Sequence, residues 1–170
     1  FRRVLFRSAG VDLTSIAMRS LLSASITGAE CNTREWRAAE IPAAGGTGNA
    51  RSVGRVHSAL ACGGEVDGVR LLSLAGVERI LVEQAHDVDL VLGMKMRLGT
   101  GFGLMNEVIP LSPNPRSFFW GGWGGSIAVT DLDAELTVSY VMNRMADALV
   151  GDLRGAMLTF AAYQGLAAAE

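Results

Sequence analysis

One short segment limits the folds open to this chain more than any other. Residues 118–126 read Phe-Phe-Trp-Gly-Gly-Trp-Gly-Gly-Ser, so positions 120–125 hold four glycines and two tryptophans. Glycine weakens a strand, because it costs backbone entropy and leaves no side chain to pack. Two explanations for the segment are open. Either a ligand approaches the backbone closely, or the sheet is so crowded here that only glycine fits.

The sequence around this segment predicts an antiparallel sheet edge backed by a C-terminal helix. From their apolar runs we expect strands at residues 99–105, 117–130 and 136–142, the last of them buried on both faces. A turn at residues 131–134 separates the last two strands. A final helix is predicted over residues 152–168, with four side chains available for packing: Leu153, Met157, Phe160 and Leu166.

The first half of the chain predicts helices. Residues 35–41 form a helical turn, and Asn49 is placed to cap a helix over residues 50–62. Ser73 caps another helix, after which an acidic connection through Asp87 carries no predicted element. The buried stripe of that second helix is predicted from helical spacing to be Leu74, Val77, Ile80 and Leu81.

Charge and hydropathy exclude several functional classes. The net charge of −2 excludes a basic nucleic-acid binder, because neutralising phosphates takes a surplus of Lys and Arg. A hydrophobic share of 49% at so small a net charge excludes a disordered chain. The longest uncharged stretches, residues 117–130 and 155–169, are shorter than the ~20 residues that a membrane-spanning helix needs. We therefore expect neither nucleic acid nor a membrane as a partner.

The reactive residue types exclude further chemistries. The chain has no G-x-S-x-G nucleophile turn, no H-E-x-x-H zinc motif and no G-x-x-x-x-G-K-[ST] phosphate loop. His57 is expected on a helix surface or in a groove, and His86 in a solvated loop. Cys31 and Cys62 are expected to be small buried hydrophobic residues rather than nucleophiles. We expect no metal and no cofactor.

Five segments, in this order, resemble those of the β-lactamase-related serine hydrolases: residues 42–50 (PAAGGTGNA) with the helix after them, 63–73 (GGEVDGVRLLS), 101–103 (GFG), 120–122 (WGG) and 140–145 (YVMNRM). That superfamily includes class C β-lactamases, D-alanyl-D-alanine peptidases and family VIII carboxylesterases. The resemblance runs over residues 35–168. It implies an α+β, β-lactamase/transpeptidase-like fold in which an antiparallel sheet is flanked by helices.

The resemblance also implies a role for the glycine-rich segment. Trp120, Gly121 and Gly122 match the family's third motif, K-T-G, H-x-G or W-G-G, which faces the bound substrate from the sheet. Trp123 matches the position whose backbone N–H completes the oxyanion hole together with the N–H of the catalytic serine. A tryptophan in place of the lysine offers no positive charge to a β-lactam carboxylate. The resemblance therefore favours a neutral ester substrate.

The chain departs from the family in its first motif. The family uses S-x-x-K, whose serine attacks the carbonyl and whose lysine helps to take the proton. The only lysine here, Lys95, has Leu92 at the serine position, so S-x-x-K is absent. We therefore expect the nucleophile and the base to lie upstream of this chain, and the chain alone to be inactive.

The second motif is not matched either. The family has Y-x-N or S-x-N, but Tyr140 is followed two residues later by Met142. Ser112 and Asn114 fit S-x-N by letters. They lie only a few residues before the W-G-G segment, whereas the family's second motif comes from a distant helical region, so we interpret this fit as a coincidence.

We expect the chain to be a C-terminal piece. Residues 1–8 (FRRVLFRS) match the translation of a common sequencing adapter and are expected to be an artefact, and residues 9–170 are then the last part of a single domain. A signal peptide would lie outside this piece. The cytoplasm is the favoured location, and the oligomeric state is open.

The expected whole protein is a serine carboxylesterase that forms an acyl-enzyme with a small ester. A β-lactamase or D-alanyl-D-alanine peptidase, cleaving an amide, is an alternative against which Trp120 argues. A non-catalytic binding or structural protein on the same fold is the alternative of a different class. The presence of serine and lysine upstream would separate it from the hydrolases.

Overall fold

The structure is a computed structural model that describes residues 12–23 and 29–169. Residues 1–8, where we expect an adapter artefact, lie outside this part of the chain. The chain forms two compact units, residues 1–48 with 89–93 and residues 49–88 with 94–170.

The first unit contains short helices. These are α2 (Ile16–Leu21), the 3-10 helix η1 (Glu30–Asn32) and α3 (Arg34–Ala38). The Thr33 hydroxyl caps α3 by accepting a hydrogen bond from the Trp36 N–H at 3.2 Å. The helical turn predicted at residues 35–41 is thus confirmed as a five-residue helix that begins one residue earlier.

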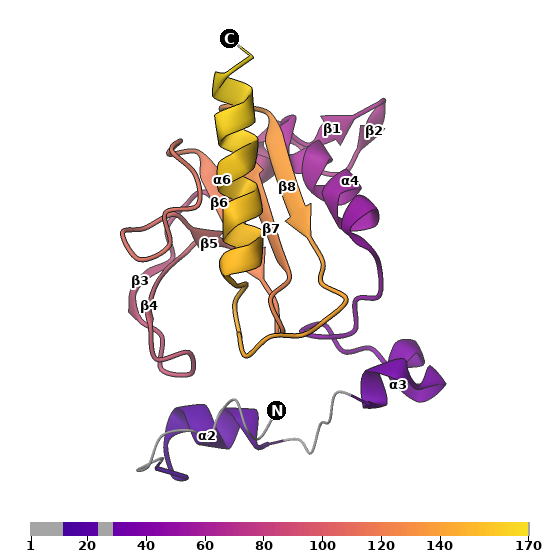
Figure 1. Ribbon diagram of the computed structural model, residues 1–170, viewed down its shortest axis with the longest axis vertical. Coiled ribbons are helices and arrows are strands. Elements are labelled where there is room, and N and C mark those ends of the chain that lie inside the picture. Colours follow the sequence, from indigo (N-terminus) through magenta and orange to yellow (C-terminus); the bar gives the residue numbers. More distant parts are fainter. Residues whose placement is uncertain (1–11, 24–28, 170) are drawn as a thin grey trace. The chain divides into compact units, whose positions relative to one another are not determined.

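The second unit is built on a six-stranded antiparallel sheet, in which each strand pairs with the next one in the chain (Figure 1). The strands are β3 (Ala85–Val88), β4 (Lys95–Leu98), β5 (Gly103–Leu104), β6 (Ser117–Gly121), β7 (Ile127–Asp131) and β8 (Leu136–Tyr140). The predicted antiparallel sheet flanked by helices is confirmed. The residues of β8 are half-buried rather than buried, because β8 is the last strand of the sheet.

Three strand predictions are wrong in detail. Residues 117–130 form a hairpin rather than one strand, because positive φ values at Gly124 (+89°) and Gly125 (+116°) turn the chain between β6 and β7. The strand expected at residues 99–105 is only two residues long. No element was predicted in the acidic connection, but it contains strand β3, and strand β4 follows it. The missed signal was the alternation of polar and apolar residues in β4, where Met96 is buried.

The predicted helices of this unit are confirmed. Helix α4 (Ala50–Ala61) begins at a capping box in which Asn49 and Ser52 satisfy each other's backbone N–H. Helix α5 (Leu74–Ile80) begins at the predicted cap, Ser73. Between them β1 (Glu65–Val66) and β2 (Val69–Arg70) form a small hairpin. Leu74, predicted to be buried, is 58% exposed because it starts the helix on its outer side.

Strand register assigns each residue of the sheet to one of two faces. Residues 118 and 120 of β6 are paired with 130 and 128 of β7, and their side chains lie on the face that α4 covers. A core cluster fills this side: Leu60, Val77, Ile80, Leu104, Phe118 and Leu132. Residues 119 and 121 lie on the opposite face, which α6 (Leu153–Ala167) covers (Figure 1).

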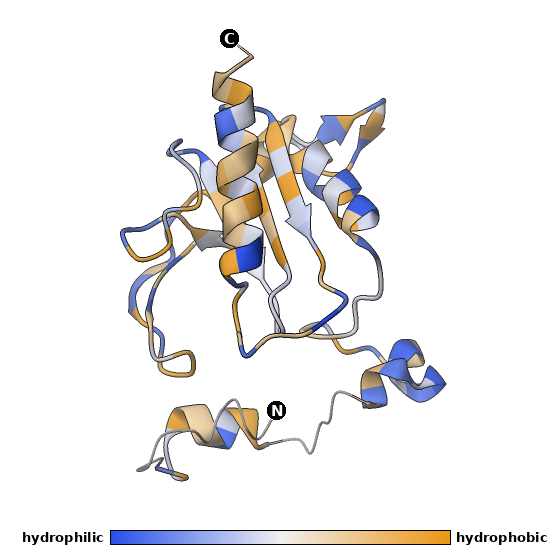
Figure 2. Ribbon diagram, viewed as in Figure 1, coloured by the Kyte–Doolittle hydropathy of each residue, from blue (hydrophilic) through white to orange (hydrophobic). Residues whose placement is uncertain are grey.

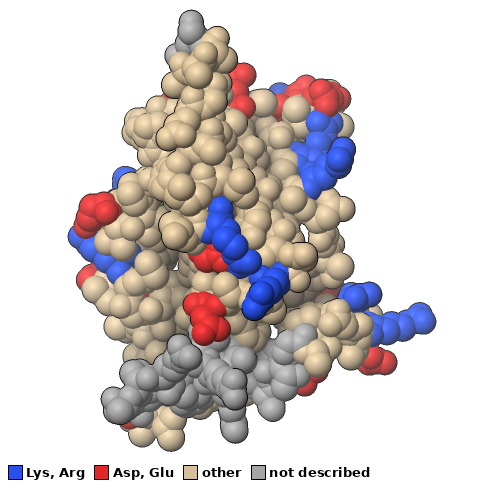
Figure 3. All heavy atoms as spheres, in the orientation of Figure 1, with Lys and Arg blue, Asp and Glu red and all other residues tan. Residues whose placement is uncertain are grey.

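Helix α6 packs through two small residues of its first half, not through the predicted ones. Gly155 and Thr159 are its buried positions. A Cβ atom on Gly155 would collide with Ile127, so only glycine allows this close approach. The four residues predicted to pack are all exposed, between 38% and 72%: Leu153, Met157, Phe160 and Leu166. The sequence of α6 is apolar around most of the helix and has one charged residue, so its periodicity did not identify the packed face. The side of α6 that faces the viewer in Figures 2 and 3 is mostly apolar and uncharged.

Two matched glycine substitutions in α6 test this packing. Helix propensity favours Ala over Gly by about 1 kcal/mol. In Gly155→Ala the added methyl would collide with Ile127 and lie 3.3 Å from Tyr140 Cδ1. We expect a net loss of about 1–3 kcal/mol in the free energy of unfolding, measured by chemical denaturation.

Gly165→Ala is the control, because a Cβ atom there would meet nothing within 4 Å. It should raise stability by up to about 1 kcal/mol. Equal effects of the two substitutions would contradict the close approach of α6 at Gly155.

Candidate functional site

The W-G-G segment begins at the end of β6, where that strand loses one of its neighbours. Strand β5 pairs with β6 only at Phe118 and Phe119. Trp120 and Gly121 still pair with β7, but among the described residues no strand lies along their other side. This end of β6 is therefore a local sheet edge, the kind of place where a ligand can approach the backbone.

The Trp120 side chain is the exposed member of an otherwise buried strand. Its indole is 43% exposed, while the other four residues of β6 are buried. By register it lies on the α4 face of the sheet, as does the buried Phe118. An exposed indole beside a sheet edge offers an apolar surface with one hydrogen-bond donor.

The glycines of this segment are explained by crowding. A Cβ atom on Gly121 would lie 2.6 Å from the carbonyl carbon of Val150 and 3.0 Å from the Cα atom of Gly151. A Cβ atom on Gly125 would overlap the Asp152 carboxylate. Of the two explanations left open by the sequence, the structure thus supports crowding for Gly121 and Gly125. Close approach of a ligand stays a prediction for the open edge at Trp120.

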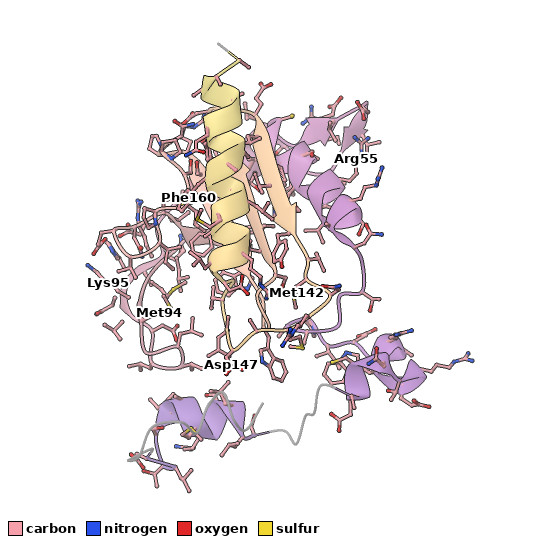
Figure 4. All side chains as sticks on the ribbon, viewed as in Figure 1. Arg55, Met94, Lys95, Met142, Asp147 and Phe160 are labelled. Atoms are coloured by element: carbon pink, nitrogen blue, oxygen red, sulfur yellow. The ribbon has the colours of Figure 1, made fainter. Side chains whose placement is uncertain are left out.

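The loop that follows β8 fixes the turn between β6 and β7. The Gly124 N–H donates to the Ala148 carbonyl, and the Ala146 N–H donates to the Gly124 carbonyl, each at 2.8 Å. The turn closes on itself through the Gly125 N–H, which donates to the Gly122 carbonyl at 3.2 Å. This loop carries Met142 and Asp147, labelled in Figure 4. Trp123 stands at the first central position of the turn and is partly buried.

The residues that fit S-x-N by letters lie at the other end of β6. Ser112 Oγ and Asn114 Nδ2 donate to Asp131 Oδ2 at 2.8 and 2.9 Å. Asp131 pairs with Ser117, the first residue of β6, whereas Trp120 and Gly121 are at its end. The two polar residues therefore belong to a different cluster from the W-G-G segment, in keeping with their interpretation as a coincidence.

That cluster is a buried polar network around Asp131. Tyr163, from α6, donates to Asp131 Oδ2 at 2.6 Å, and the backbone N–H groups of Asp133 and Ala134 donate to Oδ1. Burial by itself raises the pKa of Asp131, but its hydrogen bonds, that from Tyr163 first, outweigh burial and hold this pKa below its usual value. Burial and the bond to Asp131 raise the pKa of Tyr163. The network therefore joins an ionised Asp131 to a neutral Tyr163 and attaches α6 to the sheet.

Asp131→Asn tests the network through its pH dependence. A lowered pKa means that ionised Asp131 stabilises the fold above its unfolded-state pKa of about 4, and that this contribution is lost as pH falls through the folded-state pKa. We expect the variant to lose about 2–4 kcal/mol of unfolding free energy at neutral pH. The difference from the parent should shrink as the pH falls from about 5 to 3.

Denaturation at a series of pH values measures that difference. Asp133→Asn is the control, because Asp133 makes a surface ion pair with Arg116, which is worth about 1 kcal/mol or less. A difference between parent and Asp131→Asn that does not change with pH would contradict the role given to the carboxylate.

Lys95 lies in an ordinary surface ion pair. Its Nζ atom is 2.5 Å from Glu107 Oε1, and its side chain is 43% exposed. It extends from β4, well away from the loop with Met142 and Asp147 (Figure 4). With Leu92 three residues before it, this lysine has no serine in the S-x-x-K arrangement to activate.

The histidines and cysteines also differ from some expectations. His57 is half-buried: its Nδ1 atom is 2.8 Å from the buried Thr130 hydroxyl, and its ring meets Phe102 edge-on. Burial lowers the pKa of His57. His86 is exposed as predicted, but on a strand. Cys31 and Cys62 are both exposed, so their predicted burial is wrong; Cys31 lies in the short η1 helix and Cys62 caps the C-terminus of α4.

The described residues hold neither a metal-binding cluster nor a membrane-spanning helix. Across residues 12–23 and 29–169, no cluster of three or more His, Cys, Asp or Glu side chains could hold a metal ion. In the same part of the chain, no helix is both long enough and apolar enough to cross a membrane.

The sequence reasoning missed Asp152 and Arg154, which lie beside the Gly124 turn. Arg154 Nη2 donates to the Gly124 carbonyl at 3.0 Å, and Arg154 also pairs with Asp152. The available signal was a capping aspartate two residues before an arginine at the predicted helix start, a pattern that by itself indicates only a helix cap.

Comparisons with known proteins relate this chain to one protein family. A family model described as "Beta-lactamase" matches residues 7–160. The chain is 36% identical to the esterase/beta-lactamase LipL of Mycobacterium tuberculosis over 115 residues, which are 66% of this chain and 25% of that protein.

Solved structures agree in fold. A family VIII carboxylesterase matches with a TM-score of 0.79 at 40% identity, over 85% of this chain and 39% of that one. A penicillin-binding protein homologue from Caulobacter crescentus matches with a TM-score of 0.73 at 38% identity, over 78% of this chain and 36% of that one. EstA from Arthrobacter nitroguajacolicus Rue61a matches with a TM-score of 0.78 at 25% identity, over 96% of this chain and 44% of that one. The chain thus spans between a quarter and less than half of the length of these relatives.

Proposed function

The chain belongs to the beta-lactamase family, and from that membership we propose that the whole protein is a serine hydrolase that cleaves small carboxylic esters. The proposal depends chiefly on one observation: the W-G-G segment starts where β6 is paired with β7 but, among the described residues, no longer with β5, and Trp120 is exposed there. Relatives described as a carboxylesterase and as an esterase/beta-lactamase support the same chemistry.

The proposed reaction is acyl transfer. A serine attacks the ester carbonyl, the alcohol leaves, and water then releases the acid from the acyl-enzyme. In this proposal Trp123 donates its backbone N–H to the carbonyl oxygen as negative charge develops, and the Trp120 indole contacts the neutral substrate. Removing one such oxyanion donor typically costs about 10²–10³ in rate.

The nucleophile and base are proposed to belong to a part of the protein outside this sequence. The chain has one lysine, Lys95, which is ion-paired with Glu107 and has Leu92 three residues before it. Residues 9–170 would then form part of one catalytic domain and contribute a wall of its active site. By itself the chain should not hydrolyse esters.

Two other functions compete with this one. A β-lactamase or D-alanyl-D-alanine peptidase would act on an amide and gain from a cation at the position of Trp120. A non-catalytic protein would keep the fold and use the same wall only to bind. The penicillin-binding protein homologue among the relatives is the observation that favours the first of these two alternatives.

Labelling with a fluorophosphonate tests whether the protein is a serine hydrolase. The reagent forms a covalent bond with an activated serine. The protein expressed from its genomic locus, with any codons upstream of this sequence, should be labelled at a serine that is followed three residues later by lysine. The 170-residue chain alone should not be labelled.

Each failure of this experiment has its own meaning. A label on the isolated chain would contradict the placement of the nucleophile outside it. No label on either protein would contradict the hydrolase and favour the non-catalytic binding protein.

Substitution of Trp120 tests the choice of substrate in the protein that is labelled. Trp120→Ala should lower kcat/KM for p-nitrophenyl esters by about 10-fold or more, because a large apolar contact is lost. Trp120→Phe, which keeps an aromatic ring, should lose less. Trp120→Lys should raise the rate on a chromogenic cephalosporin relative to the esters. Unchanged kinetics on several ester chain lengths would remove Trp120 from the site.

A further inference from the structure

We propose that Arg154 is a positioning residue that holds the turn carrying Trp123 in its working orientation. This inference rests on the proposed function, in which the Trp123 N–H binds the developing oxyanion. Arg154 lies in the first turn of α6, whereas Trp123 lies between β6 and β7. The connection between them passes through the Gly124 carbonyl.

The guanidinium group uses all three of its nitrogens. Nε donates to Asp152 Oδ2 at 2.9 Å, Nη1 donates to the Arg144 carbonyl at 2.9 Å, and Nη2 donates to the Gly124 carbonyl at 3.0 Å. Nη2 also lies 2.5 Å from Asp152 Oδ2. One planar group therefore joins the start of α6, the loop after β8 and the turn after β6. A lysine ammonium is a single point and could not span these three partners.

Arg154 is itself held in place. Asp152 caps α6 by accepting the Arg154 N–H at its Oδ1 atom, so the carboxylate that orients the guanidinium belongs to the helix start. The guanidinium carbon also lies 5.7 Å from the centre of the Tyr140 ring, at the end of β8. Gly155, the next residue, presses α6 against Ile127 of the sheet. These contacts fix the position of the guanidinium relative to the sheet.

The turn is shaped to receive this group. A side chain on Gly125 would overlap the Asp152 carboxylate and lie 2.8 Å from Arg154 Nη2. The Gly124 carbonyl receives a second hydrogen bond, from the Ala146 N–H, so Arg154 and the loop hold the same oxygen. Trp123 immediately precedes Gly124. The peptide that holds the Gly124 carbonyl also donates its N–H, that of Gly125, to the Gly122 carbonyl, which lies in the same peptide unit as the Trp123 N–H, so its rotation would be transmitted to that N–H.

The chemical consequence follows from the geometry that an oxyanion donor needs. Such a donor must lie about 3 Å from the charged oxygen, and a misplacement of about 1 Å can cost about 10²-fold in rate. Because the donor acts in the transition state, loosening it should lower kcat more than it changes KM.

The test uses the whole enzyme with three substitutions. In Arg154→Gln, kcat per active site on p-nitrophenyl esters should fall by about 10- to 100-fold, with KM changed by less than about threefold. Active sites are counted by burst titration, so that unfolded protein does not enter kcat. Arg154→Lys keeps the charge and should not restore the rate. Asp152→Asn keeps an efficient helix cap but loosens the guanidinium, and should lower kcat in the same direction by less.

Arg55→Gln is the matched control. Arg55 also forms an exposed arginine–carboxylate pair, with Asp67 at 2.5 Å, but it extends from the outer side of α4 (Figure 4). This variant should keep the parental kcat and KM. A fall in kcat equal to that of Arg154→Gln would overturn the proposal, because loss of any surface arginine would then suffice.

Hydrogen–deuterium exchange gives a readout that does not need activity. Peptides covering residues 121–126 and 144–149 should exchange faster in Arg154→Gln and at the parental rate in Arg55→Gln. If the protein proves not to cleave esters, unchanged exchange in Arg154→Gln would still overturn the positioning role. In an active enzyme, faster exchange with an unchanged kcat, or fewer active sites each with a normal kcat, would overturn the link between this turn and catalysis.

Discussion

The close approach of α6 to the sheet is the contact on which the rest of this unit depends. At one end of the helix Gly155 lies against Ile127 with no room for a methyl group. Further along the helix, Tyr163 donates a hydrogen bond to the buried Asp131. The helix is therefore attached at two points about two turns apart, which fixes both its direction and its depth. A bulkier residue at the first point, or an unpaired carboxylate at the second, would release it.

This attachment also positions the turn after β6, at the opposite end of that strand from Asp131. Because α6 begins beside Gly125, its capping residue Asp152 and the neighbouring Arg154 lie against the turn after β6. The same arrangement brings the loop after β8 into backbone hydrogen bonds with Gly124. The glycines of the segment serve this packing, and they leave the Trp120 indole as the exposed group at the sheet edge. The same segment thus combines glycines that close packing requires with an exposed tryptophan at the sheet edge.

Much of the fold could be predicted from local signals. Asn49 and Ser73 are capping residues whose side chains satisfy orphan N–H groups of the next turn, and both helices begin where these residues predict. The resemblance to the β-lactamase-related hydrolases, based on short ordered motifs, is confirmed by the family match and by the solved relatives. In contrast, β3 and β5 are too short for a hydrophobic period to emerge, and both depend on pairing with strands beyond them.

The sequence by itself determined that α4, α5 and α6 are helices, where those three helices begin, and that the glycines of residues 120–125 need a particular reason. These properties arise from side chains acting on their own backbone within a few residues. Only the tertiary structure decided which face of α6 is buried, because a helix that is apolar on nearly every side has no preferred face until a sheet is brought against it. The structure also decided that Asp152 and Arg154 adjoin Gly124, a contact between residues about thirty positions apart that no local pattern encodes.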